Sequence, residues 1–142
     1  FSKLAGLAGL RIGYGIFPTW LLPHLWKIKQ PYNVNVAASL AAVAALREPG
    51  WMTEKVALIV QERKRMVAKL ARYDFLKAYP SQANFVLFQV SDRSAAQLKS
   101  DLAAQGVLVR YFNKPGLDNC IRISAGRPED TNHLVRALEK IV

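Results

Sequence analysis

The sequence contains one cysteine, Cys120, among its 142 residues. An internal disulfide bond is therefore excluded, and a lone thiol is compatible with a reducing compartment. Long apolar runs are also missing, because the longest, residues 34–46, is interrupted by Asn35 and Ser39. It falls short of the ~20 residues that a membrane-spanning helix needs. We therefore expect a cytoplasmic protein without a membrane partner.

Acidic residues are scarce: 10 Asp and Glu stand against 20 Lys and Arg, which gives a net charge of +10. One explanation is a nucleic-acid surface, and basic triplets occur at residues 27–29 and 63–65. Neither triplet extends into a basic run, and both are expected on solvated helix faces. The two histidines and Cys120 have no metal-ligand spacing. We expect no nucleic acid and no metal, but small anions as partners for some of the cations.

Apolar residues make up 51% of the chain and aromatics 10%, which is typical of a globular protein. The hydrophobic pattern predicts an α/β fold with a division near residue 50. Residues 1–50 are expected to end a larger domain, and residues 51–142 to form a small α/β domain opened by a long linking helix at about 53–72. Further elements are expected in this order: a strand at 84–90, a helix at 94–105, strands at 107–112 and 119–124, and a helix from 128.

Within residues 1–50, the pattern predicts a strand at 10–17, a helix at 19–30, a break at 31–35 and an alanine-rich helix at 36–46 that stops at Pro49-Gly50. In the long helix, apolar residues keep helical spacing, and the opposite face carries Glu62, Arg65 and other charged residues. We expect this charged face to meet solvent. Arg127 precedes the last helix, where a small hydroxyl cap would be usual, so a standard N-cap is expected to be missing.

The stretch at residues 2–13 contains Ser2, Lys3, three glycines and Arg11. An amine that can lose its proton forms a Schiff base with an aldehyde. A guanidinium grips a phosphate through two hydrogen bonds, and glycines allow close backbone approach. The Ser2 hydroxyl could add a further donor. This combination suits a phosphate-bearing aldehyde cofactor.

The pattern Ser-Lys, two residues, Gly-Leu, one residue, Gly, one residue, Arg-Ile-Gly resembles the attachment motif of fold-type-I aminotransferases. The resemblance implies that Lys3 carries pyridoxal 5'-phosphate and moves the proton, and that Arg11 and Ser2 bind the cofactor phosphate. It also implies that the chain is the C-terminal part of a fold-type-I enzyme and that this enzyme is a homodimer. Further cofactor contacts are then expected upstream of Lys3. We therefore expect a fragment that is inactive alone.

Two more stretches are similar to histidinol-phosphate aminotransferases: residues 31–35, and the arginine-bearing segments 106–110 and 120–126. This likeness implies that Arg110 and Arg122 bind the anionic end of a phosphorylated amine, with 2-oxoglutarate as the amino acceptor. Both arginines interrupt apolar strand runs, where an unpaired charge is costly. Three alternatives stay open: an aromatic amino-acid aminotransferase, a threonine-phosphate decarboxylase, and a non-enzymatic basic module that binds acidic partners.

Overall fold

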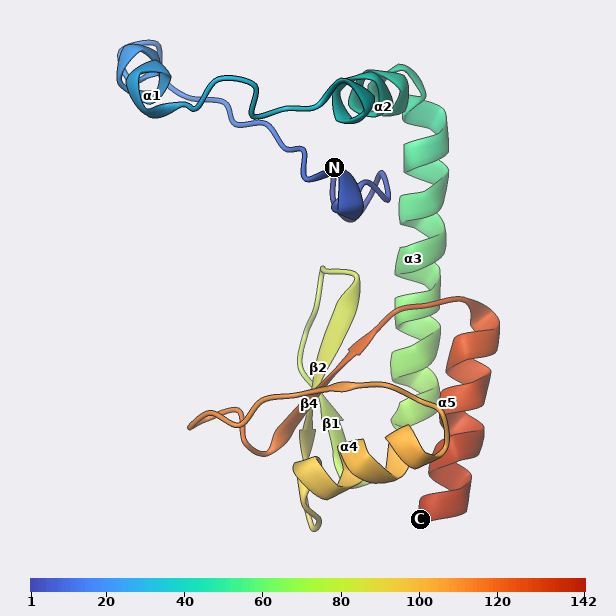
Figure 1. Ribbon diagram of the computed structural model, residues 1–142. Coiled ribbons are helices and arrows are strands. Elements are labelled where there is room, and N and C mark those ends of the chain that lie inside the picture. Colours follow the sequence, from blue (N-terminus) through green and yellow to red (C-terminus); the bar gives the residue numbers. More distant parts are fainter. The chain divides into compact units, whose positions relative to one another are not determined.

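The longest element is helix α3, Pro49–Leu70, which begins at the proline–glycine pair where the sequence predicted only the stop of the preceding helix (Figure 1). A proline is tolerated in the first turn of a helix, because it lacks only an N–H group that would have no hydrogen-bond acceptor within the helix at that position. The long helix expected at about 53–72 is therefore present, but it starts earlier than the expected position. Only Glu48 separates it from helix α2, Val36–Arg47.

The computed structural model describes residues 1–142, which divide into two compact units, Phe1–Val56 and Ala57–Val142. The first unit contains the 3-10 turn η1 (Ala8–Leu10), helix α1 (Leu22–Ile28) and α2. Helix α1 lies within the range 19–30 that the sequence predicted, and α2 extends one residue beyond the predicted range 36–46. Asn35 caps α2, because its side-chain oxygen accepts a hydrogen bond of 2.7 Å from the amide of Ala38.

The strand expected at residues 10–17 is wrong. Residues 8–10 form η1, and residues 12–18 are irregular, with no strand partner in this chain. A strand is defined by hydrogen bonds to a neighbour, which an apolar, glycine-spaced stretch cannot supply by itself. The pattern therefore did not identify a strand, because it could not provide a pairing partner.

The second unit is built on a four-stranded sheet of order β1-β2-β4-β3, in which every neighbouring pair is antiparallel. The strands are β1 (Leu76–Ala78), β2 (Phe85–Val90), β3 (Arg110–Tyr111) and β4 (Cys120–Ser124). Strand β1 was not predicted, since three residues are too few to show a period. The strand expected at 107–112 pairs only over Arg110–Tyr111.

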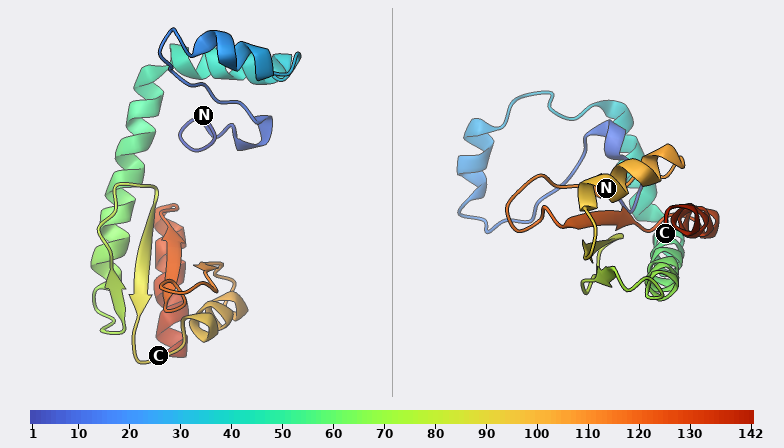
Figure 2. Two further views of the ribbon diagram at one scale, coloured as in Figure 1. Left: turned by 90° about the vertical axis from the view of Figure 1, so that its left-hand side faces the viewer. Right: turned by 90° about the horizontal axis from the view of Figure 1, so that it is seen from below.

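One face of this sheet forms the core with three helices: the C-terminal half of α3, α4 (Ala95–Ala104) and α5 (Pro128–Ile141). Val86 and Phe88 of β2 face this core beside Ile121 and Ile123 of β4. Figure 2 shows α5 alongside α3. Because side chains alternate along a strand, the residues between them face the other side of the sheet, which no helix of this unit covers. None of the helices in the chain combines the length and the apolar character required to cross a membrane.

Candidate active site

Lys3 lies in a tight turn near the start of the first unit. Its carbonyl accepts a hydrogen bond of 3.2 Å from the amide of Gly6, and its side chain is exposed. Gly6 has φ of +67°, a left-handed conformation that is costly for other residues and open to glycine. The turn therefore presents the amine of Lys3 to solvent, next to the half-buried Ser2. No carboxylate forms an ion pair with this amine, since the three ion pairs of the chain involve other residues.

Arg11 has a strained backbone, because its φ of +52° is unusual for a residue with a side chain. It ends the 3-10 turn η1, and one guanidinium nitrogen donates a hydrogen bond of 3.0 Å to the carbonyl of Ala8. The other guanidinium donors have no partner in the chain. Strained residues concentrate at ligand sites, where the surrounding structure holds them in place. The segment thus offers an amine, a hydroxyl and a guanidinium without an internal counter-ion.

Arg110 and Arg122 are direct partners across strands β3 and β4. Both side chains therefore lie on the same face of the sheet, the face that the helices leave uncovered. Two positive charges placed opposite each other destabilise a sheet unless something neutralises them. Neither arginine forms an ion pair within the chain. An anion bound between them would offset this repulsion.

Arg122 is the more enclosed of the two arginines, and its Nε is buried without a hydrogen-bond partner. Leaving a buried donor unpaired costs about 1–3 kcal/mol, so such atoms mark places where a ligand or water completes the structure. The guanidinium lies over the ring of Phe85, with 4.9 Å between its central carbon and the ring centroid. The aromatic contact holds the group but provides no acceptor for Nε.

A cavity of about 470 Å³ lies beside this pair. It is lined by residues of α3, β4, α5 and the segment 106–110, and Arg110 and Arg122 both contribute to its wall. His133 lies in the same wall and bonds the carbonyl of Gln105 at 3.1 Å. The volume is within the range of small-molecule sites. Arg110 and Arg122, which form no ion pair in the chain, thus border a space that can hold a ligand.

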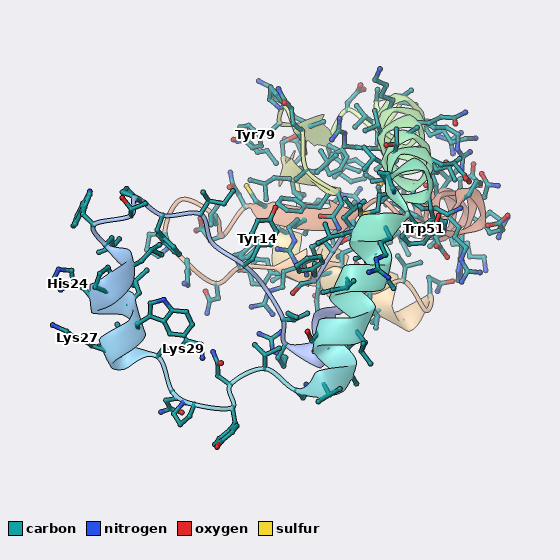
Figure 3. The ribbon with its side chains drawn as sticks, turned by 90° about the horizontal axis from the view of Figure 1, so that it is seen from above. Tyr14, His24, Lys27, Lys29, Trp51 and Tyr79 are labelled. Atoms are coloured by element: carbon teal, nitrogen blue, oxygen red, sulfur yellow. The ribbon has the colours of Figure 1, made fainter.

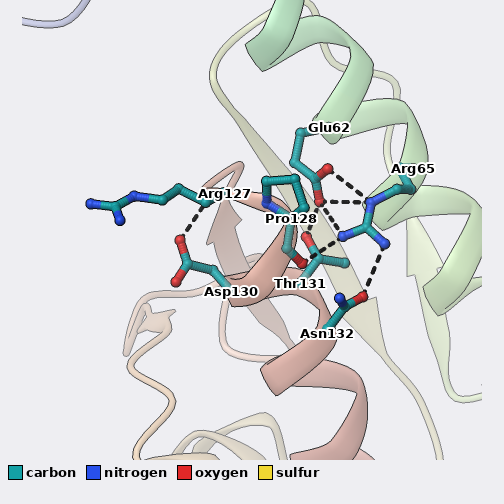
Figure 4. Close-up of polar contacts among 7 residues, drawn as sticks. All are labelled: Glu62, Arg65, Arg127, Pro128, Asp130, Thr131 and Asn132. Atoms are coloured by element: carbon teal, nitrogen blue, oxygen red, sulfur yellow. Dashed lines mark hydrogen bonds and ion pairs between the residues drawn. The ribbon is translucent and has the colours of Figure 1, made fainter.

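Glu62 was expected on the solvent face of the long helix, and this expectation is wrong: its exposed fraction is 6%. Its carboxylate accepts hydrogen bonds from the guanidinium of Arg65, with two N–O distances of 2.8 Å, and from the hydroxyl of Thr131 (Figure 4). Arg65 also donates to the carbonyl of Pro128 at 2.6 Å and to Asn132 at 3.0 Å. The sequence offered one signal, a Glu and an Arg three residues apart, but this spacing is equally common on exposed helix faces.

This network ties α3 to the first turn of α5, which forms part of the cavity wall through Thr131. The same turn has an unusual start. Arg127 has no acceptor to cap the helix, as the sequence indicated, but Asp130 reaches back and accepts a hydrogen bond of 2.7 Å from the Arg127 amide. A Cβ on Gly126 would lie 2.5 Å from the Asp130 carboxylate, so a larger residue there would displace the Asp130 side chain. Asp130 therefore fixes the loop that leads from β4 into α5.

The hydrogen bond from Arg65, followed by the bond from Thr131, lowers the pKa of Glu62 against the opposing effect of burial. A carboxyl group whose pKa is lower in the folded state contributes stability at neutral pH, and loses it as the pH falls below about 4.3 and through the folded-state pKa. We expect Glu62→Gln to reduce the free energy of unfolding at pH 7 by about 1–3 kcal/mol. The difference from the wild type should shrink steadily in acid, as measured by denaturant unfolding at a series of pH values.

The matched control is Glu54→Gln, because Glu54 forms only an exposed ion pair with its neighbour Lys55. This variant should unfold like the wild type at every pH. If the difference in unfolding free energy between Glu62→Gln and the wild type stays constant from neutral to acidic pH, the lowered pKa of Glu62 does not contribute to stability.

Several other conspicuous residues form no side-chain hydrogen bond or ion pair with the candidate site residues. Figure 3 shows His24 and Lys27 projecting from α1, both exposed, and Lys29 lies over the ring of Trp26. Burial raises the pKa of the Cys120 thiol, with Asp118 adding to the effect, so Cys120 is a poor nucleophile. No group of three His, Cys, Asp or Glu is arranged to hold a metal ion. The basic triplet at 27–29 is solvated as expected, whereas in the triplet at 63–65 Arg65 is engaged by Glu62.

Comparisons with known proteins agree on one family. The sequence model of the family described as "Aminotransferase class I and II" matches residues 1–138. A histidinol-phosphate aminotransferase of Roseiflexus castenholzii is 51% identical over 99% of this chain, which spans 39% of that protein. The crystal structure of the histidinol-phosphate aminotransferase from Clostridium acetobutylicum matches with a TM-score of 0.91 and 27% sequence identity. The match covers 99% of this chain and 43% of the Clostridium chain. The histidinol-phosphate aminotransferase from Sinorhizobium meliloti, in complex with pyridoxal-5'-phosphate, matches with a TM-score of 0.87 and 28% sequence identity. The match covers 99% of this chain and 39% of the Sinorhizobium chain.

Proposed function

This chain belongs to the class I and II aminotransferase family, and from this membership we propose that the full-length protein transfers the amino group of histidinol phosphate to 2-oxoglutarate. The chain spans about two-fifths of the length of the proteins compared with it. The activity is therefore proposed for the full-length protein, and this chain contributes the cofactor-bearing lysine and the substrate-binding arginines.

The observation that carries the proposal is the arginine pair on β3 and β4. Arg110 and Arg122 are cross-strand partners without internal counter-ions, beside a cavity of about 470 Å³. A phosphate group offers enough oxygen acceptors for two guanidinium forks, including the unpaired Nε of Arg122. An amino substrate that ends in a phosphate fits this arrangement better than one that ends in an apolar ring.

The residues at the start of the chain fit pyridoxal 5'-phosphate. Lys3 offers an exposed amine, and Arg11 and Ser2 offer donors for a phosphate within a turn that Gly6 makes possible. When bound, this cofactor supplies an aldehyde for covalent attachment and a ring that accepts electrons. We propose that Lys3 would hold it through Nζ and would carry the proton from the substrate carbon that bears the amino group to the cofactor. Arg11 balances the phosphate charge, and Arg110 and Arg122 orient the substrate.

We further propose that the full-length protein is a cytoplasmic homodimer, in which residues 1–50 end the large cofactor-binding domain and residues 51–142 form the small one. The resemblance to fold-type-I aminotransferases supports the dimer and the domain assignment. The single thiol of Cys120 is compatible with a reducing compartment. Sedimentation velocity of the full-length protein measures the oligomeric state directly.

Steady-state kinetics of the full-length protein test the proposed reaction. Histidinol phosphate, phenylalanine and threonine phosphate are each supplied with 2-oxoglutarate, and both glutamate and carbon dioxide are measured. We expect glutamate formation with the highest kcat/KM for histidinol phosphate and no release of carbon dioxide. Preference for phenylalanine would indicate an aromatic amino-acid aminotransferase, and carbon dioxide from threonine phosphate would indicate a decarboxylase. A protein that never acquires the absorbance of bound pyridoxal phosphate would contradict all three.

A further inference from the structure

Phe112 lies close to both arginines of the proposed substrate site. The central guanidinium carbon of Arg110 is 5.6 Å from the centroid of its ring, and that of Arg122 is 5.9 Å away. Attraction between a cation and an aromatic face extends to about 6 Å. The two positive groups therefore share one aromatic neighbour.

Strand geometry explains this placement. Arg110 pairs with Arg122, and Phe112 comes two residues after Arg110, so all three side chains lie on one face of the sheet. Phe112 is thus a diagonal neighbour of Arg122, within reach of a long side chain. Phe85 on β2 is the diagonal neighbour on the other side of Arg122. Arg122 consequently has two aromatic neighbours, whereas Arg110 has Phe112 alone.

We propose that Phe112 is a positioning residue for the anionic end of the substrate, an inference that rests on the proposed function. Strand β3 contains only two residues, so backbone pairing holds Arg110 weakly. The negative face of the Phe112 ring attracts both guanidiniums and offsets part of their mutual repulsion. The ring thereby keeps Arg110 beside Arg122, in an arrangement that can bind one phosphate group from two sides.

This role differs from ordinary packing in its consequences. Phe112 is only half-buried, and it follows the last residue of β3. Loss of its ring removes the aromatic contact of Arg110 and leaves Arg122 in contact with Phe85. The effect should therefore appear as weaker binding of the anion through Arg110, with the chemical step unchanged.

Inorganic phosphate serves as the probe, with the full-length protein loaded with pyridoxal phosphate so that the cofactor already occupies the Arg11 segment. Calorimetry should show that Phe112→Leu raises the Kd for phosphate roughly 2- to 5-fold, as expected for the loss of an exposed cation–π contact. Phe112→Tyr keeps the aromatic face and should bind phosphate like the wild type. For histidinol phosphate, the leucine variant should raise KM by a similar factor and leave kcat unchanged.

A double-mutant cycle tests the partner. When Arg110→Ala is already present, Phe112→Leu should have little further effect, because the group it positions is gone. The matched control is Phe75→Leu, since Phe75 also lies under a guanidinium, that of Arg93 at 4.0 Å, but has no aromatic contact with Arg110 or Arg122. This control should leave phosphate binding unchanged even if it lowers the melting temperature.

Three results would overturn the inference: a leucine variant that binds phosphate like the wild type, a tyrosine variant as weak as the leucine variant, or additive effects in the cycle with Arg110→Ala. A wild-type protein that binds phosphate but forms no glutamate would contradict the proposed function instead. The calorimetric comparison of the Phe112 variants does not depend on turnover, so the two failures remain distinguishable.

Discussion

Replacing Lys3 by alanine is expected to lower the rate of amino transfer by the full-length protein roughly 10³-fold or more, because the variant loses both covalent attachment and the proton carrier. Lys3→Arg should be equally inactive. Arginine keeps the positive charge but does not give up its proton near neutral pH, so it can neither attach to an aldehyde nor move a proton. The measurement is glutamate formation from histidinol phosphate at saturating substrate.

The attachment itself has a separate readout. Borohydride reduction of the loaded wild-type protein should fix the cofactor on the peptide that contains Lys3, and mass spectrometry should find no label there in Lys3→Ala. Lys27→Ala is the matched control, since Lys27 is an exposed lysine on α1 without a hydrogen bond or ion pair. Label on another lysine, or full activity in Lys3→Arg, would contradict the assignment of Lys3.

In the second unit, the position of an element could be predicted wherever apolar residues within that element recur at helical or alternating spacing. Helices α4 and α5 and strands β2 and β4 were expected close to their observed positions, because each is long enough to show alternating or helical spacing of apolar residues. Strand β1 was missed, and β3 was predicted too long, since both depend on pairing with a neighbour more than on their own pattern. Sheet order and register, which place Arg110 opposite Arg122, are properties of the whole chain.

For the candidate site, the sequence indicated candidate residues for the chemistry but not the residues that contact and position them. Lys3, Arg11, Arg110 and Arg122 were proposed from the resemblance to fold-type-I aminotransferases and from their charge in an apolar or glycine-rich setting. Glu62 was assigned to the wrong face, because the partner that makes its burial favourable, Thr131, is 69 residues away in sequence. The proximity of Phe112 to both arginines likewise depends on a register that local patterns do not encode.

Arg122→Ala is expected to lower kcat/KM for histidinol phosphate roughly 10²- to 10³-fold, which corresponds to about 3–4 kcal/mol for two charge-assisted hydrogen bonds in an enclosed site. Arg110→Ala should have a smaller effect, because Arg110 is exposed whereas Arg122 is half-buried with Nε unpaired. Both variants should retain far more of their activity with phenylalanine, which carries no phosphate. Arg122→Lys keeps the charge but loses the planar fork, so it should recover only part of the loss.

The matched control for this pair is Arg136→Ala, since Arg136 is an exposed arginine on α5 that lies outside the cavity wall and outside every ion pair. It removes the same charge from the same unit and should leave kcat/KM unchanged. A uniform loss across phosphorylated and unphosphorylated substrates in Arg122→Ala would show that the residue maintains the fold, or binds a group common to both substrates. A loss confined to histidinol phosphate would support binding of its phosphate group. A larger loss for Arg122→Ala than for Arg110→Ala would follow from the deeper burial of Arg122.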